Sequence, residues 1–95
     1  MYYVYVIQSE KGNRYYIGYT SDIEERIKLH NTGYFGGRTY TRKASDWEIF
    51  LLICCETVTQ AIYVESRIKK MKSRRYIENL KMYPELVEKI LKKNL

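Results

Sequence analysis

The feature that most constrains the fold of this chain is a pair of similar segments near its start, Tyr2–Gln8 and Tyr15–Thr20. Both are rich in aromatic and β-branched residues, which favour strands. The stretch between them contains Gly12-Asn13, a dipeptide typical of tight turns. The sequence therefore predicts an antiparallel β-hairpin at the beginning of the chain.

The turn also sets which residues of the hairpin face one another. In a tight hairpin, paired residue numbers sum to about 23 here, so Tyr5 is expected opposite Gly18 and Ile7 opposite Tyr16. Side chains alternate across a strand, so this register puts Tyr5 and Tyr16 on one face as diagonal neighbours. A slip of one residue would separate them.

A helix is expected after the hairpin, over about residues 22–31. Residues 21–24 have the pattern of a capping box, with Ser21 as the N-cap. On a helical wheel, Arg26 and His30 fall beside the apolar stripe, on the side that faces the protein. A charged side chain is uncommon in such a position.

The second half of the chain predicts one strand and further helices. Trp47–Glu56 is a nearly continuous apolar run of strand length, and we interpret it as the most buried strand, with a short buried helix left open by periodicity. A capped start at Thr57 leads into a helix over Ala61–Lys72. Another helical stretch, Arg74–Lys81, and a last helix with Pro84 in its first turn are expected to follow.

Glu65 lies beside the expected apolar face of the 61–72 helix, rather than on its solvent side. That face consists of Ala61, Val64, Ile68 and Met71. An unpaired carboxylate next to buried residues is costly, which suggests a functional role. The plainer alternative is an i,i+4 ion pair between Glu65 and Lys69.

Composition limits the kinds of protein that the chain can form. Ninety-five residues suit a single domain, and no apolar run approaches the length of a membrane span. A net charge of +6 favours a polyanionic partner.

Cys54 and Cys55 are adjacent, so in a strand they point to opposite faces and do not pair. With a single histidine, a structural zinc site is not expected. The start lacks the pattern of a signal peptide, so a cytoplasmic protein is expected.

Several of these segments together resemble one family. Tyr3-Val4-Tyr5, Tyr16-Ile17-Gly18, Asp22–Arg26, His30-Asn31 and the later Glu65 resemble the GIY-YIG nuclease module. The resemblance covers roughly the first eighty residues and is strongest to small stand-alone members. Tyr3 replaces the first glycine of the motif, as it does in other stand-alone members.

The resemblance implies an α+β fold, with a three-stranded antiparallel sheet flanked by helices. It implies one GIY-YIG domain over residues 1–95, with a core of about 1–80 and a helical extension over 81–95. The expected activity is hydrolysis of DNA phosphodiester bonds by an endonuclease that uses one divalent cation, Mg²⁺ or Mn²⁺. Single-stranded, branched or otherwise structured DNA is the expected substrate, with RNA left open. A monomer is favoured, with a dimer left open.

Site residues follow from the resemblance position by position. The expected catalytic residues are Tyr5, Tyr16, Arg26 and His30, with Glu65 as the metal ligand and Gly18 as a structural part of the motif. We favour Tyr5 as the general base and Tyr16 as the group that orients water or phosphate, and the reverse assignment stays open. Phenolate formation needs nearby positive charge, which Arg26 and a metal ion provide. Some relatives also use an asparagine, for which Asn79 is the candidate here.

Two basic regions are candidates for holding nucleic acid. In the Gly- and Thr-rich segment 34–45, the candidate contacts are Arg38, Tyr40, Thr41 and Arg42. In the second half, Lys69 and Lys72 belong to a cationic run whose other members are Arg67, Lys70, Arg74 and Arg75. Two other interpretations compete with catalysis: a non-catalytic nucleic-acid-binding module on the same fold, and a small structural or protein-interaction protein.

Overall fold

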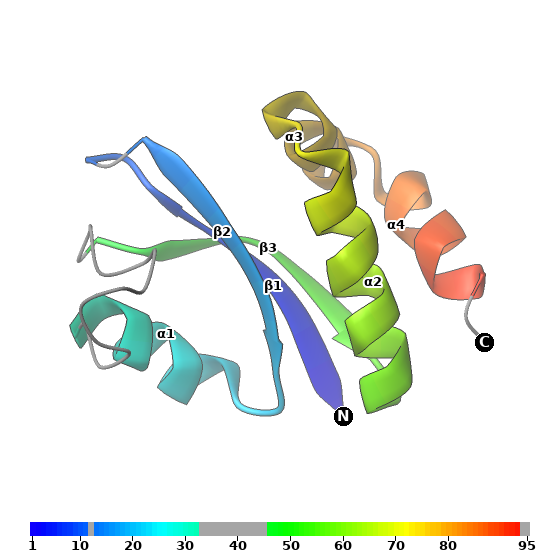
Figure 1. Cartoon of the computed structure of the whole chain (residues 1–95), viewed down its shortest axis with the longest axis horizontal. Helices are drawn as coiled ribbons and strands as arrows, with labels where there is room; N and C mark the ends of the chain where they lie inside the picture. Colours follow the sequence, from blue (N-terminus) through cyan, green and yellow to red (C-terminus); the bar gives the residue numbers. More distant parts are fainter. Residues whose placement is uncertain (12, 33–45, 94–95) are drawn as a thin grey trace.

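The structure, a computed structural model, describes residues 1–11, 13–32 and 46–93. Its elements in chain order are β1 (Tyr2–Ser9), β2 (Arg14–Thr20), α1 (Ile23–Thr32), β3 (Glu48–Cys55), α2 (Val58–Met71), α3 (Arg74–Met82) and α4 (Pro84–Lys92). The strands form one antiparallel sheet in the order β2-β1-β3 (Figure 1). The α+β fold with a three-stranded sheet is confirmed. No helix among the described residues is long and apolar enough to cross a bilayer.

The predicted register of the hairpin is confirmed. Tyr5 pairs with Gly18, and Ile7 pairs with Tyr16. Tyr5 and Tyr16 therefore share a face of the sheet, and their ring centroids lie 6.4 Å apart.

The most buried strand is β1, so the prediction that the 47–56 strand holds that position is wrong. β1 lies between the other two strands, and its residues from Val4 to Ile7 are at most 1% exposed. β3 is an edge strand, and Ile49 and Leu52 are 46% and 38% exposed. An edge strand with incomplete cover can hold apolar residues at its surface, which the pattern of residue types alone does not reveal.

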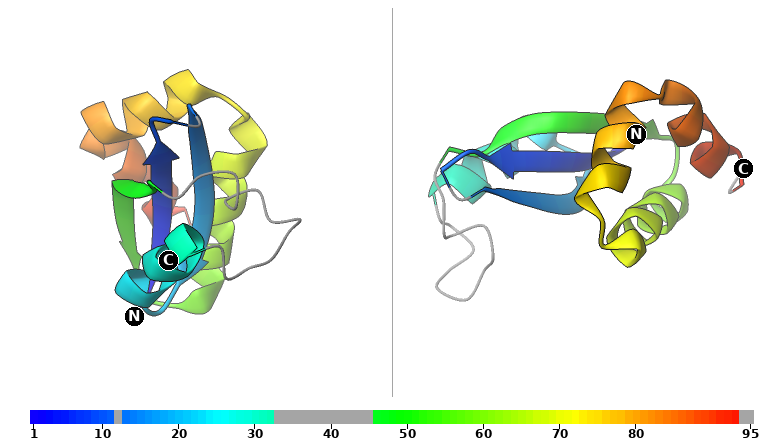
Figure 2. Two further views of the ribbon diagram at one scale, coloured as in Figure 1. Left: turned by 90° about the vertical axis from the view of Figure 1, so that its left-hand side faces the viewer. Right: turned by 90° about the horizontal axis from the view of Figure 1, so that it is seen from above.

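Alternation along β1 divides the interior in two. Val4 and Val6 belong to the larger core, which also contains residues of α2, α3 and α4. Tyr5 and Ile7 point to the other face, where Trp47 and residues of α1 cover them. Figure 2 shows α2, α3 and α4 gathered at the opposite end of the molecule from α1. The two faces of β1 thus belong to two separate clusters, and Tyr5 belongs to the cluster on the α1 side.

The N-cap of α1 is Asp22, so the prediction of Ser21 is wrong by one residue. The Asp22 carboxylate accepts a hydrogen bond from the backbone N–H of Glu25 at 3.2 Å. Thr20 Oγ1 accepts one from the Asp22 N–H at 3.1 Å, which fixes the approach to the helix. The threonine hydroxyl therefore moves the cap one position along.

The N-cap of α2 is Thr57, whose hydroxyl accepts a hydrogen bond from the Gln60 N–H as expected. Met71, in contrast, is 48% exposed, so its assignment to the apolar face is wrong. Met71 is the last residue of α2, and the chain turns immediately afterwards through Lys72 into α3. A position at the helix end lies beyond the sheet that buries the earlier turns.

Asn31 fixes the far end of α1 against the sheet. Its side chain accepts a hydrogen bond from the Trp47 N–H at 2.7 Å and donates one to the Trp47 carbonyl at 3.1 Å. This two-point contact holds α1 at the start of β3, so Asn31 has a positional role. Cys55 is buried, Cys54 is exposed and both are free, as the sequence predicts.

Candidate active site

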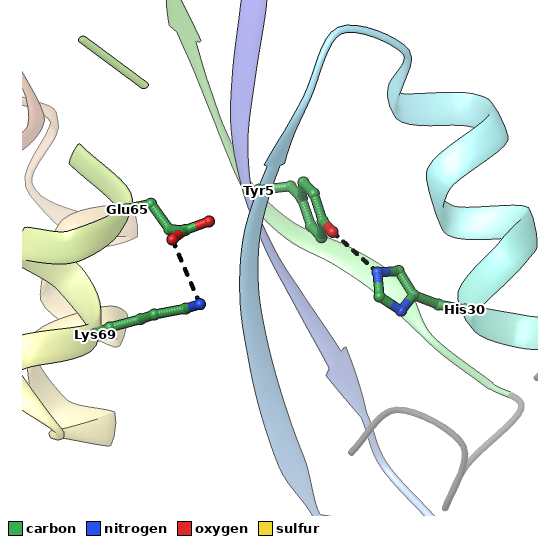
Figure 3. Close-up of polar contacts among 4 residues, drawn as sticks. All are labelled: Tyr5, His30, Glu65 and Lys69. Carbon is green, nitrogen blue, oxygen red and sulfur yellow. Dashed lines mark hydrogen bonds and ion pairs between the residues drawn. The ribbon is translucent and has the colours of Figure 1, made fainter. Parts of the chain in front are cut away.

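The centre of the candidate site is the phenol of Tyr5, which is 1% exposed. Its Oη lies 2.9 Å from Nε2 of His30, which is itself 2% exposed (Figure 3). His30 comes from the last turns of α1 and reaches back to the middle of β1. The helix that Asn31 anchors therefore brings the histidine to the tyrosine.

Gly18 leaves the space that the Tyr5 ring occupies. A Cβ at position 18 would lie 2.4 Å from Tyr5 Oη and 2.7 Å from Cζ. Real carbon atoms do not approach so closely, so no larger residue fits while Tyr5 keeps this position. The structural role expected for Gly18 has a physical cause, which is close packing of a side chain on backbone.

Tyr16 and Arg26 lie around the same phenol. The Tyr16 ring centroid is 4.9 Å from that of His30. Arg26 is partly buried and is close enough to Tyr5 to contribute both its charge and a hydrogen bond. Three elements, β1, β2 and α1, thus bring four predicted catalytic residues together.

Glu65 joins this group from the other side of the sheet edge. Figure 3 shows Glu65 and Lys69 on one side of β2, with Tyr5 and His30 on the other. The Glu65 side chain is 17% exposed, and its Oε1 lies 3.4 Å from Lys69 Nζ. The i,i+4 ion pair considered from the sequence is therefore present. Such a pair contributes about 0.3–0.5 kcal/mol, so it exchanges readily for a stronger ligand.

One pocket of about 370 Å³ contains Tyr5, Tyr16, Gly18, Arg26 and Glu65, whereas His30 contacts Tyr5 and is not part of the described lining. Its described lining consists of Tyr2, Tyr5, Tyr16, Gly18, Tyr19, Thr20, Ser21, Arg26 and Glu65. Tyr2, Tyr19, Thr20 and Ser21 were not among the residues expected from the sequence. Tyr2 and Tyr19 could have been found from the hairpin register, because it puts them on one face of the sheet at the same end.

Burial governs the electrostatics of the Tyr5–His30 pair. Burial, together with the nearby Arg26 charge, lowers the pKa of His30 to about 4. His30 is therefore neutral at pH 7. Burial, followed by the proximity of Tyr16, raises the pKa of Tyr5 well above its ordinary value, while Arg26 opposes that rise. The resting pair is a neutral phenol beside a neutral imidazole.

The donor set of the pocket suits one kind of metal ion. Within the described residues, no three His, Cys, Asp or Glu side chains gather closely enough to hold a metal by themselves. Glu65 supplies the carboxylate among the described lining residues. Mg²⁺ in proteins is commonly held by one or two carboxylates together with waters and substrate phosphates. The residues therefore fit a cation completed by the substrate, and they do not fit a metal cage made by the protein alone.

The cationic run of the second half does not lie on one surface, and its Arg75 lines the pocket that contains Phe50. Lys69, Lys72 and Arg74 line a shallow pocket beside Tyr15 of β2. Lys69 Nζ also lies 6.0 Å from the centroid of the Tyr16 ring, at the rim of the candidate site. Arg67 instead lines a pocket beside α4. The structure thus places Lys69 next to the candidate site, with Lys72 and Arg74 in the pocket that Lys69 also lines and Arg67 at another surface.

Other residues expected from the sequence are not brought into the pocket. Asn79 lines a different pocket, together with Phe50 and Tyr83. Its backbone carbonyl accepts a hydrogen bond from the Tyr83 N–H at 2.8 Å. Arg38, Tyr40, Thr41 and Arg42 lie outside the described residues.

Comparisons with known proteins find one matching family model and several similar proteins. The family model of the GIY-YIG catalytic domain matches residues 1–79. A UPF0213 protein of Bacillus pumilus is 33% identical over 95 residues, which cover 97% of this chain and 94% of that protein. A UPF0213 protein of Halobacterium salinarum is 35% identical over 71 residues, covering 75% of this chain and 88% of that protein. The solution NMR structure of a UPF0213 protein from Bacillus halodurans is 32% identical, with a TM-score of 0.51 and coverage of 84% of this chain and 82% of that one.

Proposed function

Because this chain belongs to the GIY-YIG catalytic domain family, whose members are generally endonucleases, we propose that it is a metal-dependent DNA endonuclease. It hydrolyses phosphodiester bonds in single-stranded, branched or otherwise structured DNA, using Mg²⁺ or Mn²⁺. The net charge of +6 supports a polyanionic substrate. The domain acts as a single unit over residues 1–95.

One observation carries this proposal: Tyr5, Tyr16, Arg26 and Glu65 come from four different elements and line the same pocket. These residue types match the needs of phosphodiester hydrolysis. The reaction needs a proton acceptor for the attacking water, positive charge near the phosphate oxygens and a hard oxygen ligand for a cation. Packing alone would not require a carboxylate and a guanidinium at the same pocket.

Tyr5 and His30 handle the proton in this proposal. As the water oxygen bonds to phosphorus, the bond from phosphorus to the leaving oxygen breaks, and that oxygen takes a proton from solvent. A water O–H bond breaks at the same time, and a Tyr5 Oη–H bond forms. The original phenolic proton passes to His30 Nε2 along the 2.9 Å contact, and His30 becomes an imidazolium. This relay avoids a free phenolate, which burial of Tyr5 disfavours. His30 is neutral at pH 7, and its tautomer with the proton on Nδ1 leaves Nε2 able to accept the phenolic proton.

Arg26 and Tyr16 bind and orient the phosphate. The guanidinium donates hydrogen bonds to phosphate oxygens and counters the charge that builds up during attack. An anionic phosphate beside Arg26 also offsets the charge that lowers the pKa of His30, so substrate binding strengthens the proton acceptor. Tyr16 orients water or phosphate through its hydroxyl. A divalent cation held by Glu65, water and the phosphate supplies further positive charge for the same purpose.

The experiment compares cleavage of labelled single-stranded, duplex and branched DNA in the presence of Mg²⁺ or Mn²⁺. Glu65→Ala and Tyr5→Phe are each expected to lower the rate by about 100-fold or more. Glu88→Ala removes an exposed carboxylate on α4 and serves as the matched control, with an unchanged rate.

Unimpaired cleavage by Glu65→Ala would contradict the metal-ligand role. If the wild-type protein binds DNA but cleaves none of the three substrates with either metal, the chain is the non-catalytic binding module instead.

A further inference from the structure

Tyr2 and Tyr19 line the candidate active-site pocket, and the proposed chemistry does not use them. Val4 pairs with Tyr19 across the hairpin, and Tyr2 lies two residues before Val4 on the same strand. Side chains two apart in a strand share a face, so Tyr2 and Tyr19 are diagonal neighbours. Both residues are partly exposed, and both pack against the larger core and line the pocket.

Tyr2 and Tyr19 lie on the same side of the sheet as Glu65. The face that carries Tyr2 and Tyr19 is the face on which α2 packs, so the pair lies on the Glu65 side of the sheet. Figure 1 shows that β1 starts, β2 ends and α2 begins at the same end of the molecule. Tyr5 and Arg26 line the pocket from the α1 side. The pocket therefore has an aromatic part adjoining its charged part.

A nucleotide has the same two parts. When its phosphate lies between Arg26 and Glu65, the attached sugar and base extend into the neighbouring part of the pocket. Aromatic side chains bind bases by stacking on their faces, and such stacking tolerates any of the four bases. A base inside a duplex already stacks on its neighbours and cannot offer its face to the protein.

We propose that Tyr2 and Tyr19 form a stacking subsite for an unpaired base next to the scissile phosphate. This inference rests on the proposed function, because it places the base by reference to the phosphate that is cut. It narrows the substrate class to DNA with at least one unpaired nucleotide at the cleavage position. The affinity that the subsite adds comes from contacts with the base and not from contacts with the DNA backbone.

The test measures binding without cleavage, in EDTA. The first probe is a short single strand that contains 2-aminopurine, whose fluorescence falls when the base stacks on an aromatic ring. The second probe is an abasic strand of the same length and charge, labelled for anisotropy. We expect the wild-type protein to quench 2-aminopurine and to bind the base-bearing strand about tenfold more tightly than the abasic strand.

Variants separate stacking from folding. The Tyr2→Leu and Tyr19→Leu double variant keeps apolar packing on the core but has no aromatic face. It is expected to lose the quenching and to bind both strands equally. The Tyr2→Phe and Tyr19→Phe double variant keeps both rings and should retain the wild-type behaviour. Tyr63→Leu removes a tyrosine that packs on the same core away from the pocket, and it should also retain the preference.

Equal affinity of the wild-type protein for the two strands overturns the proposal, and so does full quenching by the Leu double variant. These results are distinct from a failure of the proposed function. A protein that shows the base preference but cleaves no DNA keeps the subsite and loses the nuclease assignment. A protein that cleaves DNA without any base preference keeps the nuclease assignment and loses the subsite.

Discussion

Gly18 and the phenol of Tyr5 face each other across the β1–β2 hairpin at a distance that admits no Cβ. Tyr5 cannot easily give way, because it is buried and its Oη contacts His30. We therefore expect Gly18→Ala to lower the free energy of unfolding by about 1–3 kcal/mol, as overpacking does. Cleavage should fall as well, because the phenol is displaced. Urea unfolding measures the first effect, and single-turnover cleavage measures the second.

A double-mutant cycle isolates the cause of this loss. In a Tyr5→Val background the ring is absent, so Gly18→Ala should cost much less free energy of unfolding than it does in the wild type. If Gly18→Ala alone leaves both stability and cleavage unchanged, the Tyr5 ring moves freely and Gly18 does not determine its position.

His30 gives the folded protein a pH dependence of known sign. Its pKa is lowered from 6.5 to about 4 in the fold, so the unfolded chain binds more protons between these values. Stability therefore falls as the pH drops through this window, and the contribution of the neutral imidazole is fully present only above 6.5. Between pH 6.5 and about 5 we expect a loss of about 1–2 kcal/mol in the free energy of unfolding.

The control for this prediction is His30→Gln, which does not titrate and keeps an acceptor for the Tyr5 hydroxyl. His30 is the single histidine of the chain, so the variant should show little pH dependence in the same window. Urea unfolding of both proteins at several pH values measures the difference. An equal pH dependence in the two would mean that His30 is accessible to protons in the folded state.

At the scale of elements, short sequence patterns correctly predicted the features that local interactions determine, namely a hairpin register and a helix start. The Gly12-Asn13 turn predicted the register that brings Tyr5 to Gly18, and Thr57 predicted the start of α2. Errors arose where a neighbour outside the pattern decided the outcome. For example, the Asp22 N–H donates to the Thr20 hydroxyl, and Asp22 rather than the predicted Ser21 caps α1.

The burial of a strand depends on its place in the sheet, which short sequence patterns do not predict. An apolar run has the same sequence at the centre and at the edge of a sheet, so β3 could not be distinguished from a central strand. The candidate site was predicted through its family resemblance together with helical periodicity, which put Arg26 and Glu65 on inward-facing positions. The hairpin register puts Tyr2 and Tyr19 on one face, but their place beside Glu65 required the packing of α2 on the sheet, which no single segment encodes.

At the scale of the whole molecule, the net charge of +6 matters through its distribution. Lys72 lines the same pocket as Lys69, whose ammonium lies at the rim of the candidate site, whereas Lys89 of α4 lines the separate pocket that contains Arg67. A strand of DNA that leaves the site past Lys69 would meet Lys72 on the same surface, while Lys89 belongs to a different one. The two groups should therefore contribute unequally to DNA binding.

Lys72 is also informative because of its backbone. Its φ of 48° and ψ of 40° are left-handed, a conformation that glycine adopts at helix ends without strain. A lysine there keeps a positive charge at some cost in stability. Lys72→Gly should consequently leave the free energy of unfolding unchanged or raise it by up to about 1 kcal/mol. The same variant removes one cation from the surface next to the site.

We expect Lys72→Gly to bind single-stranded DNA about fivefold more weakly at ~0.1 M salt, and to lower the slope of log affinity against log salt by about 0.7, as loss of one phosphate contact does. Lys89→Ala removes the same charge from the α4 surface and should change neither quantity. Anisotropy titrations over a range of salt concentrations, performed in EDTA, measure both. Equal effects of the two variants would show that DNA responds to total charge alone. The opposite order would place the DNA on the α4 surface, away from the candidate active site.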